Sequence, residues 1–409
     1  MKNPDLLFLS DSYPYSVNYE WKRLELKALT SIGLEVDLIP FTYKQKIVDQ
    51  AFDQSIQLEL PTLGNHRYVK WYHLYFLCSV HAPYFLKEFF KFKVYKKKEW
   101  FNKWFLASLY TYLIYRSKPI KDIRRMTVDE CQRVIVYSYW AMANALVLPR
   151  LAMKFKKVII RAHGYDLYSE RQGGYIPYQH EMLKTADVIA CISEDGRRYL
   201  EGKYADLSPK LKLYYLGVDV PQEVSDFSNQ GIFHMVTSSR VIDLKRLDRL
   251  VKALPMVKGK LKWTHLGDGP DLGKIKALAK GLKPDQYEVS FEGWLNSEQL
   301  KSFYENETVN VFVNLSWSEG LPVSIMEAIS YGIPIIATDV GGTREIVDST
   351  NGKLLNKDFS DEELVSALEH FMEMPLDKMM QYRKSARSTA LEKFDFSKNS
   401  SRFINDVIQ

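Results

Sequence analysis

A repeated alternation of short apolar segments with helical patterns restricts the fold of this chain more than any other feature. Near the start, an apolar segment at residues 6–9 is followed by a helical pattern that ends at Gly33, and then by a second apolar segment at residues 35–39. Strands that alternate with helices in this way pair in parallel, because each helix carries the chain back across the sheet. Further segments extend the predicted sheet at residues 134–137, 158–160 and 188–191.

A second series of the same kind follows a polar, proline-containing stretch. Its apolar segments lie at residues 233–236, 261–266, 289–291, 309–313 and 333–337. Because 409 residues are too many for one hydrophobic core, we predict an α/β chain with two doubly wound, Rossmann-like domains that face each other across a cleft. The expected parts are an N-terminal domain at 1–220, a linker at 221–230, a C-terminal domain at 231–384 and a helix at 385–409 that crosses back to the N-terminal domain.

Composition excludes several classes of protein. With 46% apolar and 26% charged residues, the chain is neither collagen-like nor of low complexity. Its three cysteines are widely spaced, which suits a reducing compartment and does not form a zinc-ligand set. The most hydrophobic stretch, residues 104–115, is shorter than the roughly 20 residues that a membrane-spanning helix needs, and the first residues lack a secretory signal pattern. We therefore expect a cytoplasmic protein.

The segment at residues 316–328 is the richest in chemistry. A buried strand leads into a loop, and Pro322 stands where a helix would begin. The free amides of Val323 and Ser324 would then point out of the helix N-terminus, which is a ready anion site. Glu319 precedes this helix and Glu327 lies inside it. Two carboxylates beside an anion site indicate a ligand with both phosphate and hydroxyl groups; the alternative is an ordinary helix start with Glu residues that favour the helix dipole.

Residues 332–347 then read as a strand, a Gly-Gly turn and a helix. With this tail, the two glutamates resemble the pattern of retaining glycosyltransferases of the GT-B fold, family 4 (glycosyl transferases group 1). That pattern is Glu, seven residues, Glu, continued as E-A-x-x-x-G-x-P-x-I-A-T-x-x-G-G-x-x-E, which residues 327–345 match. The runs R-A-H-G-Y-D-L-Y and L-P-V-S-I-M-E-A resemble bacterial enzymes that build capsule, exopolysaccharide or O-antigen repeats. The resemblance extends from about residue 6 to 355 and is weakest over 40–130.

The resemblance implies a role for each matched residue of the second domain. Arg240 and Lys245 follow a strand and would hold the donor's diphosphate, since a forked guanidinium and a point charge both suit phosphate. The implied set is completed by the amides of Val323 and Ser324 for the diphosphate, Glu319, Gly320 and Leu321 for the donor sugar, Glu327 for the ribose, and Trp294 and Leu295 for the nucleobase. The alternatives are solvated surface cations for Arg240 and Lys245, and a core aromatic for Trp294.

In the first domain, His163 follows a strand in the run R-A-H-G-Y-D. The family carries a His-Gly pair at this strand end, so the resemblance implies that His163 faces the donor sugar and acts with Glu319 in catalysis. A structural histidine is the alternative. Tyr15, Asn18 and Asp166 are candidates for the acceptor side. The loop at residues 13–20 departs from the family because it lacks the Gly-Gly pair that many members have there.

A basic and aromatic insertion is expected at residues 68–125. Residues 81–125 hold twelve Lys and Arg against three Asp and Glu, an excess of nine that exceeds the net charge of +6 of the whole chain. Lys96, Lys97, Lys98, Trp100 and Trp104 would dock on an anionic membrane surface, because interfacial helices bury aromatic rings while lysines bind anionic lipid. Two alternatives remain: a helical insertion whose aromatics pack internally, and stacking on single-stranded nucleic acid.

The sequence therefore predicts a metal-independent, retaining glycosyltransferase without a cofactor. Its substrates would be a UDP- or GDP-linked sugar and a glycan or polyprenyl-linked acceptor, and it would be peripheral on the cytoplasmic face of a membrane, with no nucleic-acid partner. Two other functions stay open: a nucleotide-sugar-binding protein without turnover, and a GT-B epimerase acting on a nucleotide sugar.

Overall fold

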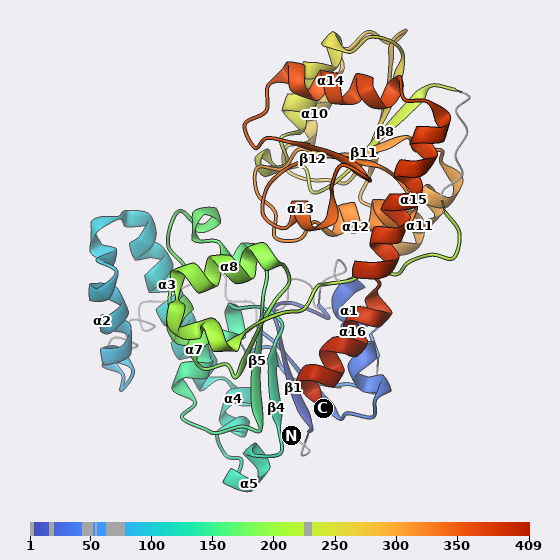
Figure 1. Ribbon diagram of the computed structural model, residues 1–409. Coiled ribbons are helices and arrows are strands. Elements are labelled where there is room, and N and C mark those ends of the chain that lie inside the picture. The colour runs from blue at the N-terminus through green and yellow to red at the C-terminus, as the bar shows by residue number, and fades with distance from the viewer. Residues whose placement is uncertain (1–3, 16–19, 43–51, 54, 63–77, 225–230) are drawn as a thin grey trace. The chain divides into compact units, whose positions relative to one another are not determined.

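The computed structural model divides the chain into two compact units (Figure 1). The first contains Met1–Tyr214 and Phe403–Gln409, and the second contains Tyr215–Arg402. The structure describes residues 4–15, 20–42, 52–53, 55–62, 78–224 and 231–409. The division falls a few residues before the linker expected at 221–230, part of which lies outside the described residues.

The first unit is built on a seven-stranded sheet in the order β3-β2-β1-β4-β5-β6-β7, and every neighbouring pair is parallel. The strands are β1 (Leu6–Ser10), β2 (Val36–Pro40), β3 (Gln57–Leu58), β4 (Ile135–Ser138), β5 (Lys157–Ala162), β6 (Val188–Cys191) and β7 (Leu211–Leu213). Successive strand residues point to opposite faces, and both faces are covered. Leu7 and Leu9 belong to one apolar core, and Leu6 and Phe8 to another.

Helices between these strands cover both faces of the sheet. They are α1 (Glu20–Ser31), α2 (Ala82–Lys91), η2 (Val94–Lys96), α3 (Lys98–Arg116), α4 (Lys118–Ile123), α5 (Val128–Cys131), η3 (Ala143–Arg150), α6 (Gly164–Leu167), η4 (Ser169–Gln172), α7 (Gln179–Lys184), α8 (Glu194–Lys203) and η5 (Ala205–Lys210). The core that contains Phe8 is completed from far along the chain by Phe403, Ile404, Val407 and Ile408.

The second unit repeats the plan with a six-stranded parallel sheet in the order β10-β9-β8-β11-β12-β13. Its strands are β8 (Phe233–Ser238), β9 (Leu261–Leu266), β10 (Tyr287–Gly293), β11 (Val311–Asn314), β12 (Ile335–Thr338) and β13 (Gly352–Leu355). Its helices are η6 (Asp243–Lys245), α9 (Leu247–Ala253), η7 (Leu254–Met256), α10 (Leu272–Ala279), α11 (Ser297–Asn306), α12 (Val323–Ser330), α13 (Thr343–Ile346), α14 (Asp361–Met372), α15 (Leu376–Lys393) and α16 (Phe396–Phe403). The last helix, η8 (Ile404–Ile408), belongs to the first unit.

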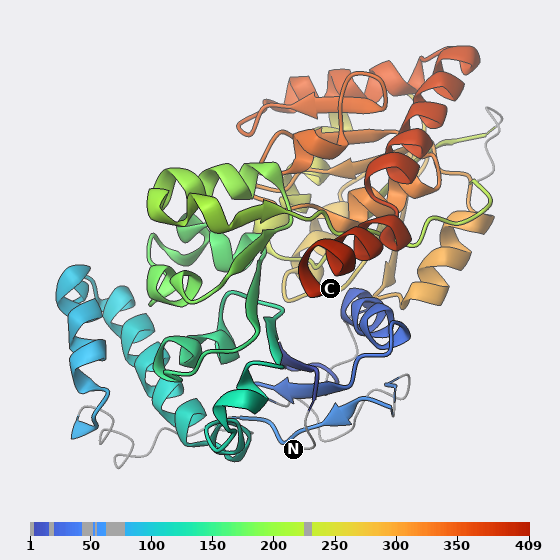
Figure 2. The same cartoon turned by 60° about the horizontal axis from the view of Figure 1, so that its bottom comes forward.

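Helices α2 and α3 form the described part of the basic and aromatic insertion and lie side by side in both views (Figures 1 and 2). Trp104 is only 4% exposed, and its indole N–H donates to the carbonyl of Phe85 at 3.0 Å. Trp100 is half-buried, stacks on Tyr175 with ring centroids 5.2 Å apart and donates to the carbonyl of Gly173 at 2.9 Å.

The expectation that Trp104 faces a membrane is therefore wrong, because its ring is buried, whereas the half-buried Trp100 leaves its own part of the expectation untested. Their rings and N–H groups pair with partners inside the first unit, as the alternative of internally packed aromatics requires. Lys96, Lys97 and Lys98 are exposed, as predicted. In the part of the chain that the structure describes, no helix is both long and apolar enough to span a membrane.

Replacement of Trp104 by Ala should destabilise the first unit, because it removes a buried ring and leaves the Phe85 carbonyl without this donor. We expect the free energy of unfolding to fall by about 3–5 kcal/mol, measured by urea denaturation. Phe101→Ala is the matched control: Phe101 is 42% exposed on the same helix, so its loss should cost about 1 kcal/mol or less. Equal losses in the two variants would contradict this account of the packing.

Candidate functional site

The candidate donor-binding residues of the second unit follow the carboxyl ends of its strands. Because all strands are parallel, these ends meet at one edge of the sheet, where ligands of such folds bind. Arg240 and Lys245 follow β8, Trp294 follows β10, and Glu319 follows β11. The sheet thus brings loops from distant parts of the sequence to one edge.

An ion pair joins two of these loops. Lys245 Nζ lies 2.5 Å from Glu319 Oε1, and the Glu319 residue is buried. The backbone amide of Trp317 donates to the carbonyl of Leu244 at 2.8 Å, which fixes the same two loops a second time. The cation and the carboxylate that the sequence assigned to neighbouring parts of a ligand are therefore in contact.

The Gly-Gly turn after β12 supports the backbone of the Glu319 loop. A Cβ atom on Gly341 would lie 2.0 Å from the carbonyl oxygen of Glu319, and Gly341 has a φ of +53°, so glycine fits for two reasons. The Gly342 amide also donates to the carbonyl of Gly320 at 2.8 Å. This turn sets the height of Glu319 above the sheet.

The turn after β9 supports the Arg240 loop in the same way. A Cβ atom on Gly267 would lie 1.9 Å from the carbonyl oxygen of Ser239, and one on Gly269 would lie 2.3 Å from that of Val241. These glycines allow two backbones to touch on either side of Arg240, whose side chain is exposed.

Helix α12 begins at Val323, with Pro322 as its N-cap. The amides of Val323 and Ser324 therefore belong to the first turn, as predicted. Glu327 lies one turn further on. Burial raises the pKa of its carboxyl group to about 7, and among the described residues that group has no hydrogen-bond or ion-pair partner. Glu327 is half-buried, so its unpaired carboxyl group is suited to accept hydrogen bonds from a ligand's hydroxyl groups.

Two tryptophans at this edge are exposed. Trp294 is 48% exposed, which contradicts the alternative of a core aromatic; the next residue, Leu295, is half-buried. Trp317 is 46% exposed, and Lys357 Nζ lies 3.8 Å from its ring centroid. The sequence analysis did not single out Trp317, although it stands two residues before Glu319 in the richest motif.

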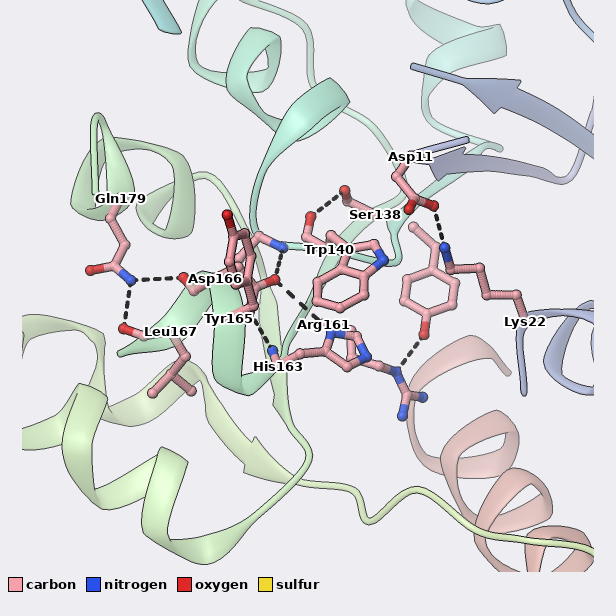
Figure 3. Close-up of polar contacts among 12 residues, drawn as sticks. Asp11, Lys22, Ser138, Trp140, Arg161, His163, Tyr165, Asp166, Leu167 and Gln179 are labelled. Carbon is pink, nitrogen blue, oxygen red and sulfur yellow. Dashed lines mark hydrogen bonds and ion pairs between the residues drawn. The ribbon is translucent and has the colours of Figure 1, made fainter. Parts of the chain in front are cut away.

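In the first unit, His163 follows β5 and caps α6 (Figure 3). Its residue is buried, and neither ring nitrogen has a hydrogen-bond partner in the described part of the chain. Burial, aided by the positive charges of Arg161 and Lys22, holds the pKa of His163 well below its ordinary value. The imidazole is therefore neutral and offers one donor and one acceptor.

Asp166 ties the end of β4 to the end of β5. One carboxylate oxygen accepts from the backbone amide of His163 at 2.6 Å, and the other accepts from that of Ala141 at 2.7 Å. Burial raises the pKa of Asp166 to about 7. Both oxygens therefore bind backbone amides of the fold, and the place of Asp166 on the acceptor side stays a prediction.

Charged pairs surround this part of the first unit. Lys22 is fully buried and pairs with Asp11, and Arg161 Nη2 lies 2.9 Å from Glu25 Oε1. Tyr15 lies in the loop after β1, at the same edge of the sheet, and is half-buried. Asn18, the other acceptor-side candidate of this loop, lies outside the described residues.

Comparison with known proteins identifies the type of fold. Residues 225–389 match the family described as glycosyl transferases group 1. The chain is similar to the putative colanic acid biosynthesis glycosyltransferase WcaL of Salmonella typhimurium, with 22% identity over 271 residues that cover 62% of this chain and 65% of the relative. It is also similar to the lipopolysaccharide 1,6-galactosyltransferase of Escherichia coli, with 34% identity over 112 residues, 27% of this chain and 31% of the relative. These alignments cover less than two thirds of the relatives' length.

Solved structures match over almost the whole chain. The apo form of the lipopolysaccharide outer core galactosyltransferase WaaB has a TM-score of 0.68 at 15% identity and covers 98% of this chain and 99% of that chain. Anabaena HepE in complex with UDP and glucose has a TM-score of 0.67 at 15% identity with the same coverage. The predicted fold class is confirmed: the chain has two parallel-sheet, Rossmann-like domains, as in GT-B glycosyltransferases.

Replacement of Gly341 by Ala should destabilise the second unit. The new Cβ atom would meet the Glu319 carbonyl oxygen at 2.0 Å and would hold an L-residue at a positive φ, so the free energy of unfolding should fall by more than about 1 kcal/mol. Gly273→Ala is the matched control, because a Cβ atom there meets nothing within 4 Å in helix α10. It should raise stability by about 0.4–1 kcal/mol. Urea denaturation measures both, and an unchanged Gly341→Ala variant would contradict the support role of this turn.

Proposed function

We propose that this protein is a retaining, metal-independent glycosyltransferase that takes part in the synthesis of a bacterial cell-surface polysaccharide. It would move a sugar from a nucleoside diphosphate to a glycan or a polyprenyl-linked acceptor. The observation that carries the proposal is the contact between Lys245 and Glu319 at the carboxyl edge of the second sheet, beside the N-terminus of α12. One ligand that satisfies a cation, free amides and carboxyl groups together is a nucleotide sugar.

The leaving group is the nucleoside diphosphate, and its negative charge grows as the sugar departs. Arg240, Lys245 and the first amides of α12 would stabilise that charge where it develops. Arg240 is exposed and free of any ion pair among the described residues, so it is available to phosphate. This arrangement performs the task that a metal ion performs in other transferases.

The donor sugar is neutral, so the protein would hold it through hydrogen bonds to the sugar's own hydroxyl groups. Glu319 would accept from the donor sugar and support the positive character that develops at its anomeric carbon, while Glu327 would accept from the ribose. The bond from the anomeric carbon to the diphosphate breaks as the bond to the acceptor oxygen forms on the same face. The acceptor proton passes to the departing phosphate, so no protein nucleophile is required.

A UDP-linked donor has the most support. HepE was solved with UDP and with UDP-glucose, and several relatives of this chain are UDP-N-acetylglucosamine–peptide N-acetylglucosaminyltransferase subunits of streptococci. Colanic acid and lipopolysaccharide appear in the names of others, which supports a cell-surface glycan as product. The two alternative functions would differ from sugar transfer in their products. A protein that only binds nucleotide sugars would release no product. An epimerase would release an epimer and would need no acceptor.

We also propose that the protein docks on an anionic membrane surface through α2, η2 and α3, by other residues than the two tryptophans. Phe90, Tyr95 and Phe101 are 64%, 56% and 42% exposed, and each ring contacts Phe89, with centroids 5.3, 5.8 and 6.4 Å apart. We call these four residues the Phe89 cluster. The exposed lysines of the same segments are Lys87, Lys91, Lys93, Lys96, Lys97 and Lys98. Exposed rings among lysines suit an interface of anionic headgroups and acyl chains.

Arg240→Ala and Lys245→Ala should each weaken UDP binding roughly tenfold to a hundredfold, because a hydrogen bond to a charged group contributes about 1.5–3 kcal/mol. Calorimetry in the presence of EDTA measures the affinity, and melting curves check that the buried Glu319 tolerates the loss of Lys245. Lys252→Ala is the control, since Lys252 is exposed and pairs with Asp248 on helix α9. The wild type should also turn over a UDP-sugar. Failure to bind UDP, GDP or their sugars would refute the proposed function.

Affinity for UDP-glucose should rise as the pH increases from about 6 to 8. The pKa of Glu327 is raised to about 7, so the carboxyl is mostly protonated at pH 6 and mostly ionised at pH 8, and only the ionised form accepts fully from the ribose hydroxyls. UDP-glucose is the probe because its diphosphate does not titrate in this range. Glu327→Gln should bind more weakly and flatten the pH dependence. If the Glu327→Gln variant keeps the pH dependence of UDP-glucose affinity, another group is responsible for it.

Binding to phosphatidylglycerol vesicles should have two separable parts. Replacing Lys96, Lys97 and Lys98 by Gln should remove much of the salt-sensitive part, since each cation near an anionic surface contributes about 1 kcal/mol. Replacing Phe90 and Phe101 by Ser should remove the salt-resistant part. Val128→Ser is the control, because Val128 is 69% exposed on α5, outside the Phe89 cluster. No sedimentation of the wild type with these vesicles at low salt would end the membrane proposal and leave the glycosyltransferase proposal intact.

A further inference from the structure

Three neighbouring residues of the first unit carry buried polar atoms that lack hydrogen-bond partners. They are the hydroxyl of Tyr139, the indole nitrogen of Trp140 and both ring nitrogens of His163. Each of these atoms is buried, and none has a hydrogen-bond partner in the part of the chain that the structure describes; His163 Nδ1 lies 4.0 Å from Asp166 Oδ2. Native proteins pair the large majority of such atoms, so four on three adjacent residues require an explanation.

The three residues lie at one place in the fold. Tyr139 and Trp140 follow β4, and His163 follows β5, which is the parallel neighbour of β4. The imidazole ring lies 4.1 Å from the Trp140 ring and 5.1 Å from the Tyr139 ring, measured between centroids. Figure 3 shows the imidazole beside the Trp140 indole, with Asp166 bound to the backbone that carries both. The cluster is therefore held in place by the backbone and not by its own polar atoms.

A general shortage of partners does not explain the unpaired atoms. Tyr137 stands two residues before Tyr139 and is equally buried, yet its hydroxyl binds Glu25 and accepts from Arg161 Nε at 2.6 Å. The fold can thus satisfy a buried tyrosine at this sheet. At the positions that follow β4 it leaves the groups unpaired, and Trp140 is only half-buried, so part of this cluster meets solvent.

The chemistry of the cluster selects its ligand. An indole donates, a phenol donates and accepts, and the neutral imidazole supplies one donor and one acceptor. Phosphate would favour cations, and a metal ion would favour carboxylates, whereas the cluster is uncharged and aromatic. A sugar ring fits, because its hydroxyl groups both donate and accept and its C–H face packs on aromatic rings.

We propose that Tyr139, Trp140 and His163 form a binding subsite for a sugar ring. The inference rests on the proposed function and extends it to two residues outside the family-like motifs. The ring could belong to the donor or to the acceptor, since both present the same chemistry. Lys22 Nζ lies 5.4 Å from the Tyr139 ring centroid and 5.7 Å from that of Trp140, but it pairs with Asp11, so the subsite itself stays neutral.

The test uses substitutions that keep the rings. Tyr139→Phe removes one hydroxyl, and Trp140→Phe removes the indole N–H while an aromatic ring remains, so both variants should fold with unchanged melting temperatures. Tyr84→Phe is the matched control. The Tyr84 hydroxyl is also buried and without a partner, but Tyr84 packs against the core on the other face of the sheet.

Two measurements separate the sources of the sugar. In the first, binding of UDP is compared with binding of UDP-glucose, UDP-galactose and UDP-N-acetylglucosamine. A donor sugar in the subsite predicts that both variants lose at least fivefold for a UDP-sugar and nothing for UDP. In the second, methyl glycosides of the same three sugars are titrated by NMR with UDP present. An acceptor sugar predicts a fivefold loss for a glycoside, with UDP-sugar binding unchanged.

The outcomes distinguish this inference from the proposed function. If neither variant changes either measurement, or if the wild type binds UDP but no sugar in any form, buried water alone pairs the four atoms and the subsite is refuted. If Tyr84→Phe causes the same losses, the effect is one of general packing and the subsite is again refuted. If the wild type fails to bind UDP, the proposed function fails, while the glycoside titration still reports on the cluster.

Discussion

Parallel pairing of every strand is the constraint on which the rest of each unit depends. It directs all carboxyl ends to one edge of a sheet, so that loops distant in sequence become neighbours. Backbone contacts then fix the positions of these loops. Gly341 packs against the Glu319 carbonyl and Gly267 against the Ser239 carbonyl, so closely that neither position has room for a side chain. These backbone contacts hold the two loops whose side chains, Lys245 and Glu319, form an ion pair.

The alternation of apolar and helical segments predicted most strands of both sheets. Residues 261–266 form β9 with the expected bounds, and residues 6–9 fall within β1. Three strands were missed: β3, β7 and β13, which are two, three and four residues long. None of the three contains an uninterrupted run of three or more apolar residues, as the predicted strands at residues 134–137 and 188–191 do. The burial of Trp104 was also missed, because it depends on partners such as Phe85 that are neighbours only in the folded insertion.

The candidate site was predicted in part. Spacing and resemblance singled out Arg240, Lys245, Glu319 and His163, and the structure puts the first three on loops at one sheet edge, with Lys245 and Glu319 in contact. The unpaired atoms of Tyr139 and Trp140 escaped notice, because lacking a partner is a property of three dimensions. One signal was available: two consecutive aromatics, Tyr139 and Trp140, follow the strand predicted at residues 134–137 after a single serine, at the same edge as His163.

The C-terminal segment has a consequence for how the protein is made. Phe403, Ile404, Val407 and Ile408 complete the core of the first unit on the face of Phe8, yet 188 residues, 215 to 402, separate them from Tyr214. At roughly 5–20 residues per second, a ribosome needs about 10–40 seconds to translate that interval. Throughout it, α1 alone cannot complete that core, so part of one apolar face of the first sheet stays exposed until residues 403–408 emerge and pack on it.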